Sequence, residues 1–206
     1  MAVTRLDHIA ITAPTLEAGV EYVRQALGVA PRPGGRHPQM GTHNCLLGLG
    51  PDAYLEVIAV DPGTVHPAEP RWFRLDRAGS TPRLAAWVAR TDDLASAAAA
   101  SPAYRRIVPF RRGDLRWDFT LPEGGDLVHD GVAPFLIQWR TRPPVLPDSG
   151  CTLEALEGRH PQAEAITQLL DRIGLQDPVR ITPAPRPALT ARIRTPFGPR
   201  ILTSLE

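Results

Sequence analysis

The chain opens with an alternation of apolar and polar residues that is typical of a half-buried strand. Residues 6–12 read LDHIAIT, and a strand over them places alternate side chains on opposite faces. One face would carry Leu6, His8 and Ala10, and the other Asp7, Ile9 and Ile11. The first element is therefore predicted to be a strand.

The apolar period changes directly after this strand. Apolar residues recur at helical spacing over residues 16–27, at Leu16, Val20, Val23 and Leu27. Thr15 can cap the first turn, and Gly28 stands where a left-handed residue commonly ends a helix. Residues 42–49 and 54–60 then predict two antiparallel strands joined by a turn at residues 50–52.

Two weaker copies of this pattern follow. The second has strands at 84–90, 114–121 and 135–140 and a short helix that begins at Asp92 or Asp93. In the third, setting Gly174 against Gly28 aligns the apolar positions of two helices, and the same offset places Glu154 on His8. We predict modules at 1–62, 83–141 and 151–206, with a polar connector at 61–82 and a proline-rich linker at 141–150.

Composition limits the function classes. The chain has 206 residues, 23 basic and 22 acidic side chains and 43% hydrophobic residues, which is ordinary for a globular protein. All the basic residues are arginine, as expected from a GC-rich genome, so arginine alone is weak evidence for anion binding. The near-zero net charge argues against a nucleic-acid partner. Two cysteines and the absence of a long apolar run favour a cytoplasmic protein without a membrane segment.

The motifs LDHIAIT, GTHN (residues 41–44) and YLEVIAV (residues 54–60) within strand-helix-three-strand modules resemble the vicinal oxygen chelate superfamily. The resemblance is to a divergent glyoxalase-like domain branch, related to glyoxalases and bleomycin-resistance proteins. It implies an α+β fold in which repeated βαβββ modules form a curved, cup-shaped mixed sheet with helices outside. Such a cup holds a divalent metal or a small organic ligand.

The resemblance also implies metal ligands on the first and last strands of each module. In the first module these positions are His8 and Glu56, which suit manganese, iron, nickel or zinc. In the second module Ala86 stands in place of the histidine, and Gln138 lies near the position of the glutamate. The metal set is thus predicted to be His8, Glu56 and Gln138, with Glu154 as the alternative if the third module completes the cup. We favour pairing of the first two modules.

Other residues are candidates for the ligand site. Glu56 can act as a general base, and Tyr54 and Ile58 on its face of the strand argue against free solvent. His43 and Asn44 alternate on one strand, so only one of them can face the cup, and the pattern does not select which. Trp117 and Trp139 can form an apolar wall.

Several polar residues are expected outside the site. His37 is expected in a loop, and His160 near the third helix. The arginine cluster, which consists of Arg105, Arg106, Arg111 and Arg112, is expected on a solvated face.

These observations predict a glyoxalase-like enzyme of the metal-assisted lyase or isomerase type, acting on an unidentified metabolite. The alternative is a non-catalytic protein that binds or sequesters a small molecule, as in the bleomycin-resistance type. In either case the predicted partner is a small-molecule ligand, and a homodimer is expected.

Overall fold

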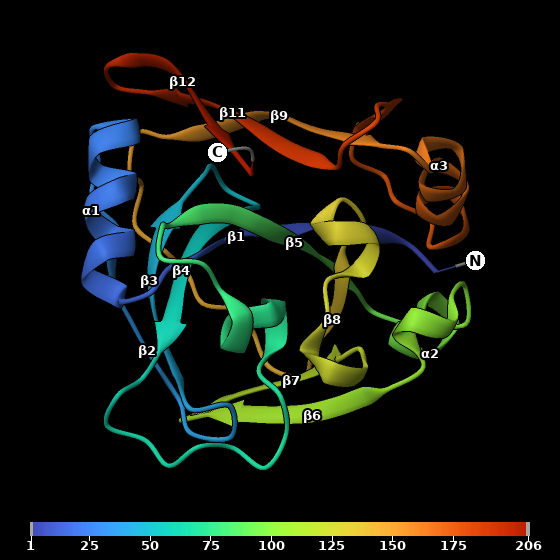
Figure 1. The fold of residues 1–206 in the computed structure, drawn as a ribbon, viewed down its shortest axis with the longest axis horizontal. Helices are drawn as coiled ribbons and strands as arrows, with labels where there is room; N and C mark the ends of the chain where they lie inside the picture. Colours follow the sequence, from blue (N-terminus) through green and yellow to red (C-terminus); the bar gives the residue numbers. More distant parts are fainter. Residues whose placement is uncertain (1, 205–206) are drawn as a thin grey trace.

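The computed structural model describes residues 2–204, which form two sheets and three α-helices (Figure 1). The larger sheet has eight strands in the order β2-β3-β4-β1-β5-β8-β7-β6 and curls into a half-barrel. Its strands are β1 (Thr4–Thr12), β2 (Arg32–His37), β3 (Thr42–Gly48), β4 (Tyr54–Val60), β5 (Arg83–Thr91), β6 (Ile107–Arg112), β7 (Leu115–Thr120) and β8 (Phe135–Trp139). The predicted cup-shaped mixed sheet is confirmed.

This sheet is built from the first two predicted modules. In each, the first strand lies beside the last, as in the parallel pairs β1 with β4 and β5 with β8. The two halves join where β1 runs antiparallel to β5. Strands β2 and β6 are additions to the sequence prediction, which treated these segments as a turn and as a surface cluster.

The third predicted module forms a separate four-stranded sheet in the order β10-β9-β11-β12. Its elements are β9 (Thr152–His160), α3 (Ala163–Arg172), β10 (Arg180–Pro183), β11 (Ala188–Thr195) and β12 (Gly198–Thr203). Helix α3 follows the predicted register, and Gly174 after it has a φ of 70°, close to the 76° of Gly28 after α1 (Leu16–Leu27). The strand pairing differs from that of the first module, because β9 lies between β10 and β11 and β12 is at the edge.

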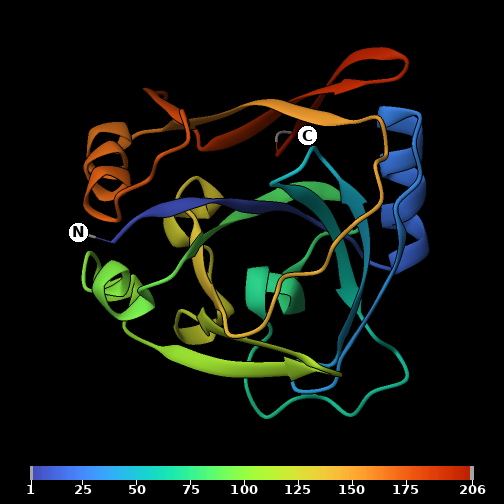
Figure 2. The same ribbon diagram turned by 180° about the vertical axis from the view of Figure 1, so that it is seen from behind.

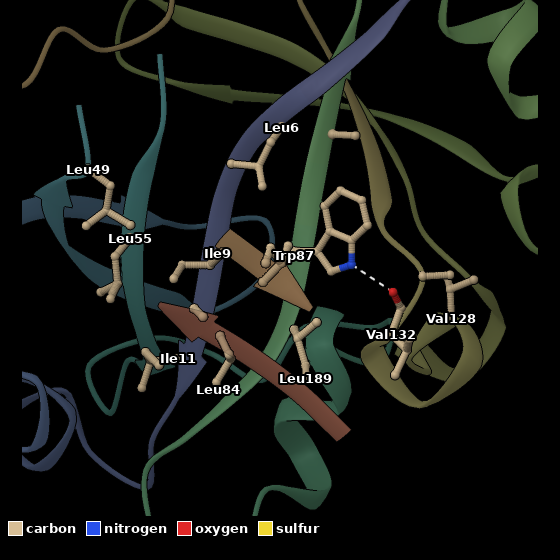
Figure 3. Close-up of a cluster of buried hydrophobic side chains, with 14 of the residues drawn as sticks. Leu6, Ile9, Ile11, Leu49, Leu55, Leu84, Trp87, Val128, Val132 and Leu189 are labelled. Carbon is tan, nitrogen blue, oxygen red and sulfur yellow. Dashed lines mark hydrogen bonds between the residues drawn. The ribbon is translucent and has the colours of Figure 1, made fainter. Parts of the chain in front are cut away.

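The main hydrophobic core lies between the convex face of the half-barrel and the second sheet. Ile9, Ile11, Leu84 and Trp87 from β1 and β5 pack with Leu189 from β11 (Figure 3). The indole N–H of Trp87 donates to the carbonyl oxygen of Val132 at 2.9 Å, which fixes the turn before β8. Helix α1 adds Val23 and Leu27, so the helix covers the outside of the cup as predicted.

A second core fills the concave side. The connector between the first two modules sends a short 3₁₀ segment, Trp72–Arg77, into the cup, and we call this segment the plug. Trp72, Phe73 and Leu75 are buried there and pack with aromatic residues of β6, β7 and β8. The sequence pattern predicts only a polar connector at residues 61–82. Its apolar residues instead occupy most of the space inside the cup.

The start of β1 is held by residues that follow α3 in the third unit. The backbone of Thr4 accepts a hydrogen bond from Gln176 and donates to Gly174, both at 3.0 Å. The Asp177 carboxylate also accepts from the backbone N–H of Leu6 at 2.6 Å. The segment between β8 and β9 runs past the end of β3 and the start of β4 on its way to the second sheet (Figure 2). No helix within residues 2–204 has the length and hydropathy needed to cross a membrane.

Candidate functional site

An irregularity in β1 brings two consecutive polar side chains to the cup. From Leu6 to His8, β1 advances by two residues while its partner strand β5 advances by only one. Asp7 is therefore an extra residue in a β-bulge. Leu6 therefore packs with Ile9 and Ile11 in the outer core, and its predicted place on the face of His8 is wrong. A strict alternation of faces cannot anticipate a bulge.

Asp7, His8 and Glu56 form a buried chain of polar contacts. His8 Nδ1 lies 2.7 Å from Asp7 Oδ1, and His8 Nε2 lies 3.4 Å from Glu56 Oε2. The other Asp7 oxygen accepts from the indole N–H of Trp139 at 3.0 Å, which links β1 to β8. Tyr54 stacks on the His8 ring with centroids 4.6 Å apart. As predicted, Glu56 lies on the same face of β4 as Tyr54 and Ile58.

The two carboxylates hold His8 in its charged form. Burial by itself lowers the pKa of His8, but hydrogen bonds and charge attraction from Asp7 and Glu56 outweigh it and raise the pKa from 6.5 to about 9. Burial likewise opposes ionisation of Glu56, yet the hydrogen bond and charge of His8 and the hydrogen bond from Asn44 lower its pKa to about 2. At neutral pH the site therefore contains an imidazolium between two carboxylates.

A second polar group joins the first through Asn44. Its amide nitrogen donates to Glu56 Oε1 at 2.5 Å, and its amide oxygen accepts from the Gly35 N–H and from Arg112. His37 Nε2 lies 3.0 Å from Arg112 Nη1 and His37 Nδ1 lies 3.0 Å from the hydroxyl oxygen of Thr42. Burial lowers the pKa of His37 to about 4, and the charge of Arg112 adds to this effect, so His37 is neutral.

The remaining wall of the site is aromatic. The cavity has a volume of about 40 Å³ and lies between the polar groups and a set of five aromatic side chains. These are Trp72 and Phe73 of the plug, Trp117 and Phe119 of β7, and Trp139 of β8. Trp117 and Trp139, both candidates for an apolar wall, line the cavity together, with ring centroids 5.6 Å apart.

The cavity sorts the other candidate residues. Asn44 lines it, whereas His43 does not. His37 and Arg112 also line it, although the sequence analysis placed the first in a loop and the second on a solvated face. These two residues belong to β2 and β6, which the sequence did not predict. Without those strands, the direction of the His37 and Arg112 side chains could not be predicted either.

Gln138 is not where the sequence analysis placed it. Its amide oxygen accepts from the backbone of Leu94 at 3.3 Å, and its amide nitrogen donates to the carbonyl oxygen of Asp92 at 2.5 Å. Both partners belong to the start of helix α2 (Leu94–Ala98), so Gln138 points away from the cup, which its neighbours Ile137 and Trp139 line. The prediction that Gln138 lies across from His8 and Glu56 is wrong.

Glu154 is also separate from the cup. It lines a cavity of about 560 Å³ between the two sheets and pairs with Arg194 at 3.2 Å. The cup is thus lined by the first two modules and the connector between them. A third cavity, of about 440 Å³, lies beneath residues 142–146 and shares only Tyr54 with the lining of the cup. We take the cup as the functional site because convergent polar groups with shifted pKa values meet an apolar wall there.

Comparison with known proteins identifies the family. The family model described as glyoxalase-like domain matches residues 6–174. The chain belongs to this glyoxalase-like family of the vicinal oxygen chelate superfamily. No curated protein matches the sequence.

Among solved structures, a hypothetical protein from Staphylococcus aureus aligns over 90% of this chain and 88% of its own, at 14% identity and a TM-score of 0.58. Methylmalonyl-CoA epimerase from Mycobacterium tuberculosis aligns over 67% of this chain and 88% of its own, at 22% identity and a TM-score of 0.44. At this level of identity the Staphylococcus aureus structure supports the fold of the glyoxalase-like chain and not an activity.

Members of this superfamily often bind divalent metals, so the donor set of the cup was compared with that chemistry. His8 and Glu56 are close enough to share an ion, but the second module lines the cavity only with Arg112 and with apolar side chains such as Ile137 and Trp139, none of which is a metal ligand. Within residues 2–204, no three His, Cys, Asp or Glu side chains are grouped to hold a metal. The guanidinium of Arg112 lines the same cavity and repels a cation. The residues of this cup do not fit the predicted metal site.

Proposed function

We propose that this glyoxalase-like protein is a small-molecule enzyme of the lyase or isomerase type in which the His8–Glu56 pair moves a proton on a ligand bound in the cup. The observation that carries the proposal is the buried contact between His8 Nε2 and Glu56 Oε2 at the wall of the cavity. One member of the pair is a proton donor and the other a proton acceptor, which suits a reaction that removes and returns one proton.

The surroundings support these roles. Asp7 binds the far side of the His8 ring, so it fixes the ring's orientation and favours the imidazolium. Asn44 holds Glu56 through the other carboxylate oxygen and leaves the carboxylate directed at His8. A ligand that separates the pair would remove the attraction that lowers the pKa of Glu56, and Glu56 would then become a stronger base.

The test is a metabolite screen read by two signals. Tryptophan fluorescence reports binding, because Trp117 and Trp139 line the cavity, and proton NMR of the mixture reports turnover. A compound that is turned over by the wild type and bound, but not turned over, by Glu56→Gln supports the proposal. Turnover by Glu56→Gln at the wild-type rate would contradict it.

Non-catalytic sequestration is the second candidate function, and the aromatic wall of the cavity favours it. In that case compounds quench the fluorescence saturably, and no product forms in either the wild type or Glu56→Gln. A homodimer and a cytoplasmic location stay predictions. Native mass measurement tests the first, and fractionation of the producing cells tests the second.

A further inference from the structure

The cup contains a hydrogen-bond donor that no residue within 2–204 satisfies. The indole nitrogen of Trp72 is buried and has no hydrogen-bond partner in the part of the chain that is described. Trp72 is only 4% exposed and is one of the residues that line the cavity. A buried N–H without an acceptor costs about 1–3 kcal/mol, so such a group is expected to have a partner in the working protein.

A positive charge without an acidic partner lines the same cavity. Arg112 bonds to the neutral groups His37 Nε2 and Asn44 Oδ1. None of the ion pairs formed within residues 2–204 includes Arg112, whereas the nearby Arg106 and Arg140 each pair with a carboxylate. An arginine directed at a cavity by two neutral acceptors retains its ability to bind an anion through its remaining N–H groups.

Apart from the hydroxyl of Tyr54, the acceptors of the cup are already in use. Glu56 faces Asn44 on one oxygen and His8 on the other, and the Asn44 oxygen receives two donors. Asp7 faces His8 and Trp139. His37 receives Arg112 on Nε2, so its proton is on Nδ1 and is directed at Thr42. What remains for a ligand is mainly donors, and one of them is on a cation.

From this imbalance we infer that the cup recognises a carboxylate, held by the Arg112 guanidinium and the Trp72 indole N–H. The cavity has a volume of about 40 Å³, which leaves room for a group of the size of a carboxylate. This inference rests on the proposed function only in using the same cavity. It makes the plug part of the binding site, because Trp72 belongs to it.

The experiment is a titration of ¹⁵N-labelled protein followed by NMR. The chain has four tryptophans, and the indole resonance of Trp72 is the one that disappears in Trp72→Phe. The probes are acetate and benzoate, with their neutral amides, acetamide and benzamide, as controls. Acetate or benzoate is expected to move the Trp72 resonance to lower field with saturation, because the N–H gains a charged acceptor. The amides are expected to leave it in place.

Two substitutions on β6 form a matched pair. Arg112→Gln is expected to weaken carboxylate binding by at least about tenfold, the loss typical of a charged hydrogen bond. Arg111→Gln, on the exposed face of the same strand, is expected to leave it unchanged. Trp72→Phe is the second test if Arg112→Gln does not fold, and it should weaken binding several-fold with the Trp139 resonance as reporter.

Several outcomes would overturn the inference. One is that acetate and benzoate do not shift the Trp72 resonance at concentrations lower than those at which the amides shift it. The others are that acids and amides bind with equal affinity, or that Arg112→Gln binds carboxylates with unchanged affinity. Glu56→Gln separates this inference from the proposed function, because it should retain benzoate binding while it abolishes turnover. Wild-type turnover in Glu56→Gln would contradict the proposed function alone, whereas failure of the wild type to bind acetate or benzoate would contradict this inference alone.

Discussion

Single residues in the cup change the ionisation of their neighbours. His8 contacts two carboxylates, and its pKa of about 9 in the folded protein compares with 6.5 for the ordinary side chain. A raised pKa means that the folded state binds the His8 proton more tightly than the unfolded chain does. The contribution of His8 to stability is therefore present in full below pH 6.5 and is lost as the pH rises to about 9.

This sign gives a measurable difference between the wild type and His8→Gln. Between pH 6.5 and 9 the free energy of unfolding of the wild type should fall relative to that of the variant, by about 3 kcal/mol at most. Urea denaturation at a series of pH values measures both curves. Parallel curves over this interval would show that His8 does not gain its proton on folding.

The donor set of the cup predicts low metal content. His8 and Glu56 are the suitable ligands that lie together there, both ring nitrogens of His37 are bonded to Arg112 and Thr42, and Arg112 opposes a cation. Protein purified without an affinity tag should contain well under about one divalent ion per chain, and a chelator should not move its thermal midpoint. Stoichiometric manganese, iron, nickel or zinc that disappears in His8→Ala would contradict this reading of the site.

At the residue scale, the sequence predicts the central pair of the site, His8 and Glu56, but not Asp7 and Arg112 beside them. The motif residues His8 and Glu56 could be recognised, and alternation placed Glu56 with Tyr54. The bulge at Asp7 could not be predicted from the alternation of apolar and polar residues. An extra residue in a strand reverses the faces of the residues on one side of it, and nothing in the residue types marks where this happens. Arg112 was obscured by a chain in which every basic residue is arginine.

At the scale of elements, the strands depend on tight turns that support them from outside. The turn before β8 approaches β5 so closely that a side chain at Gly131 would have its Cβ 2.1 Å from the carbonyl oxygen of Ala85. Gly131 also has a φ of 88°, a conformation that side chains disfavour. Both the space and the backbone therefore require glycine at this position.

Gly131→Ala is accordingly expected to lower the free energy of unfolding by about 2–4 kcal/mol. Gly79→Ala is the matched control, because a Cβ there meets nothing within 4 Å and its φ is not in the left-handed region. It should change stability by less than about 0.5 kcal/mol. Chemical denaturation of the two variants tests the difference, and equal stability of both would show that the β5 contact yields easily.

Elements were predicted best where local signals are strong. Thr15 accepts a hydrogen bond from the N–H of Ala18 and Gly28 ends α1, as the sequence indicates. The pattern of α3 was equally clear, yet it could not reveal that its strands pair in another order, since pairing depends on contacts distant in sequence. Strand β2 (RPGGRH) has two glycines and a proline, so it is formed by its neighbour β3 rather than by propensity.

At the scale of the whole molecule, the two sheets share one hydrophobic core. Residues of β9, β11 and β12 pack on the convex face of β1 and β5, and neither sheet buries that face alone. Chains with one shared core usually unfold in a single cooperative transition. The repeated helices predicted the three units. An amphipathic pattern shows which face of an element is buried but not which other element covers it, so the packing of the second sheet on β1 and β5 could not be predicted.

Cooperativity can be tested because all four tryptophans lie in the half-barrel and the plug, at positions 72, 87, 117 and 139. Ile193 is fully buried on β11, so Ile193→Ala should lower the free energy of unfolding by about 2–4 kcal/mol. If the molecule unfolds as one unit, the unfolding midpoint measured by tryptophan fluorescence, which reports on the other sheet, should shift by as much as the midpoint measured by circular dichroism. Ile201→Ala, 57% exposed on β12, is the control and should move neither. Separate midpoints for the two probes would indicate that the sheets unfold independently.

The attachment of β1 to residues 174–177 has a consequence for synthesis on the ribosome. The first strand leaves the exit tunnel early, but β5, its antiparallel neighbour, begins at residue 83, and the backbone partners of Thr4 are residues 174 and 176. The part of the apolar face of β1 that packs against β11 stays uncovered until nearly the whole chain has been made, although α1 and β4 are available to β1 much earlier. The nascent chain thus leaves this part of the strand that carries His8 exposed during most of elongation, and that interval is when chaperones have the most opportunity to bind it.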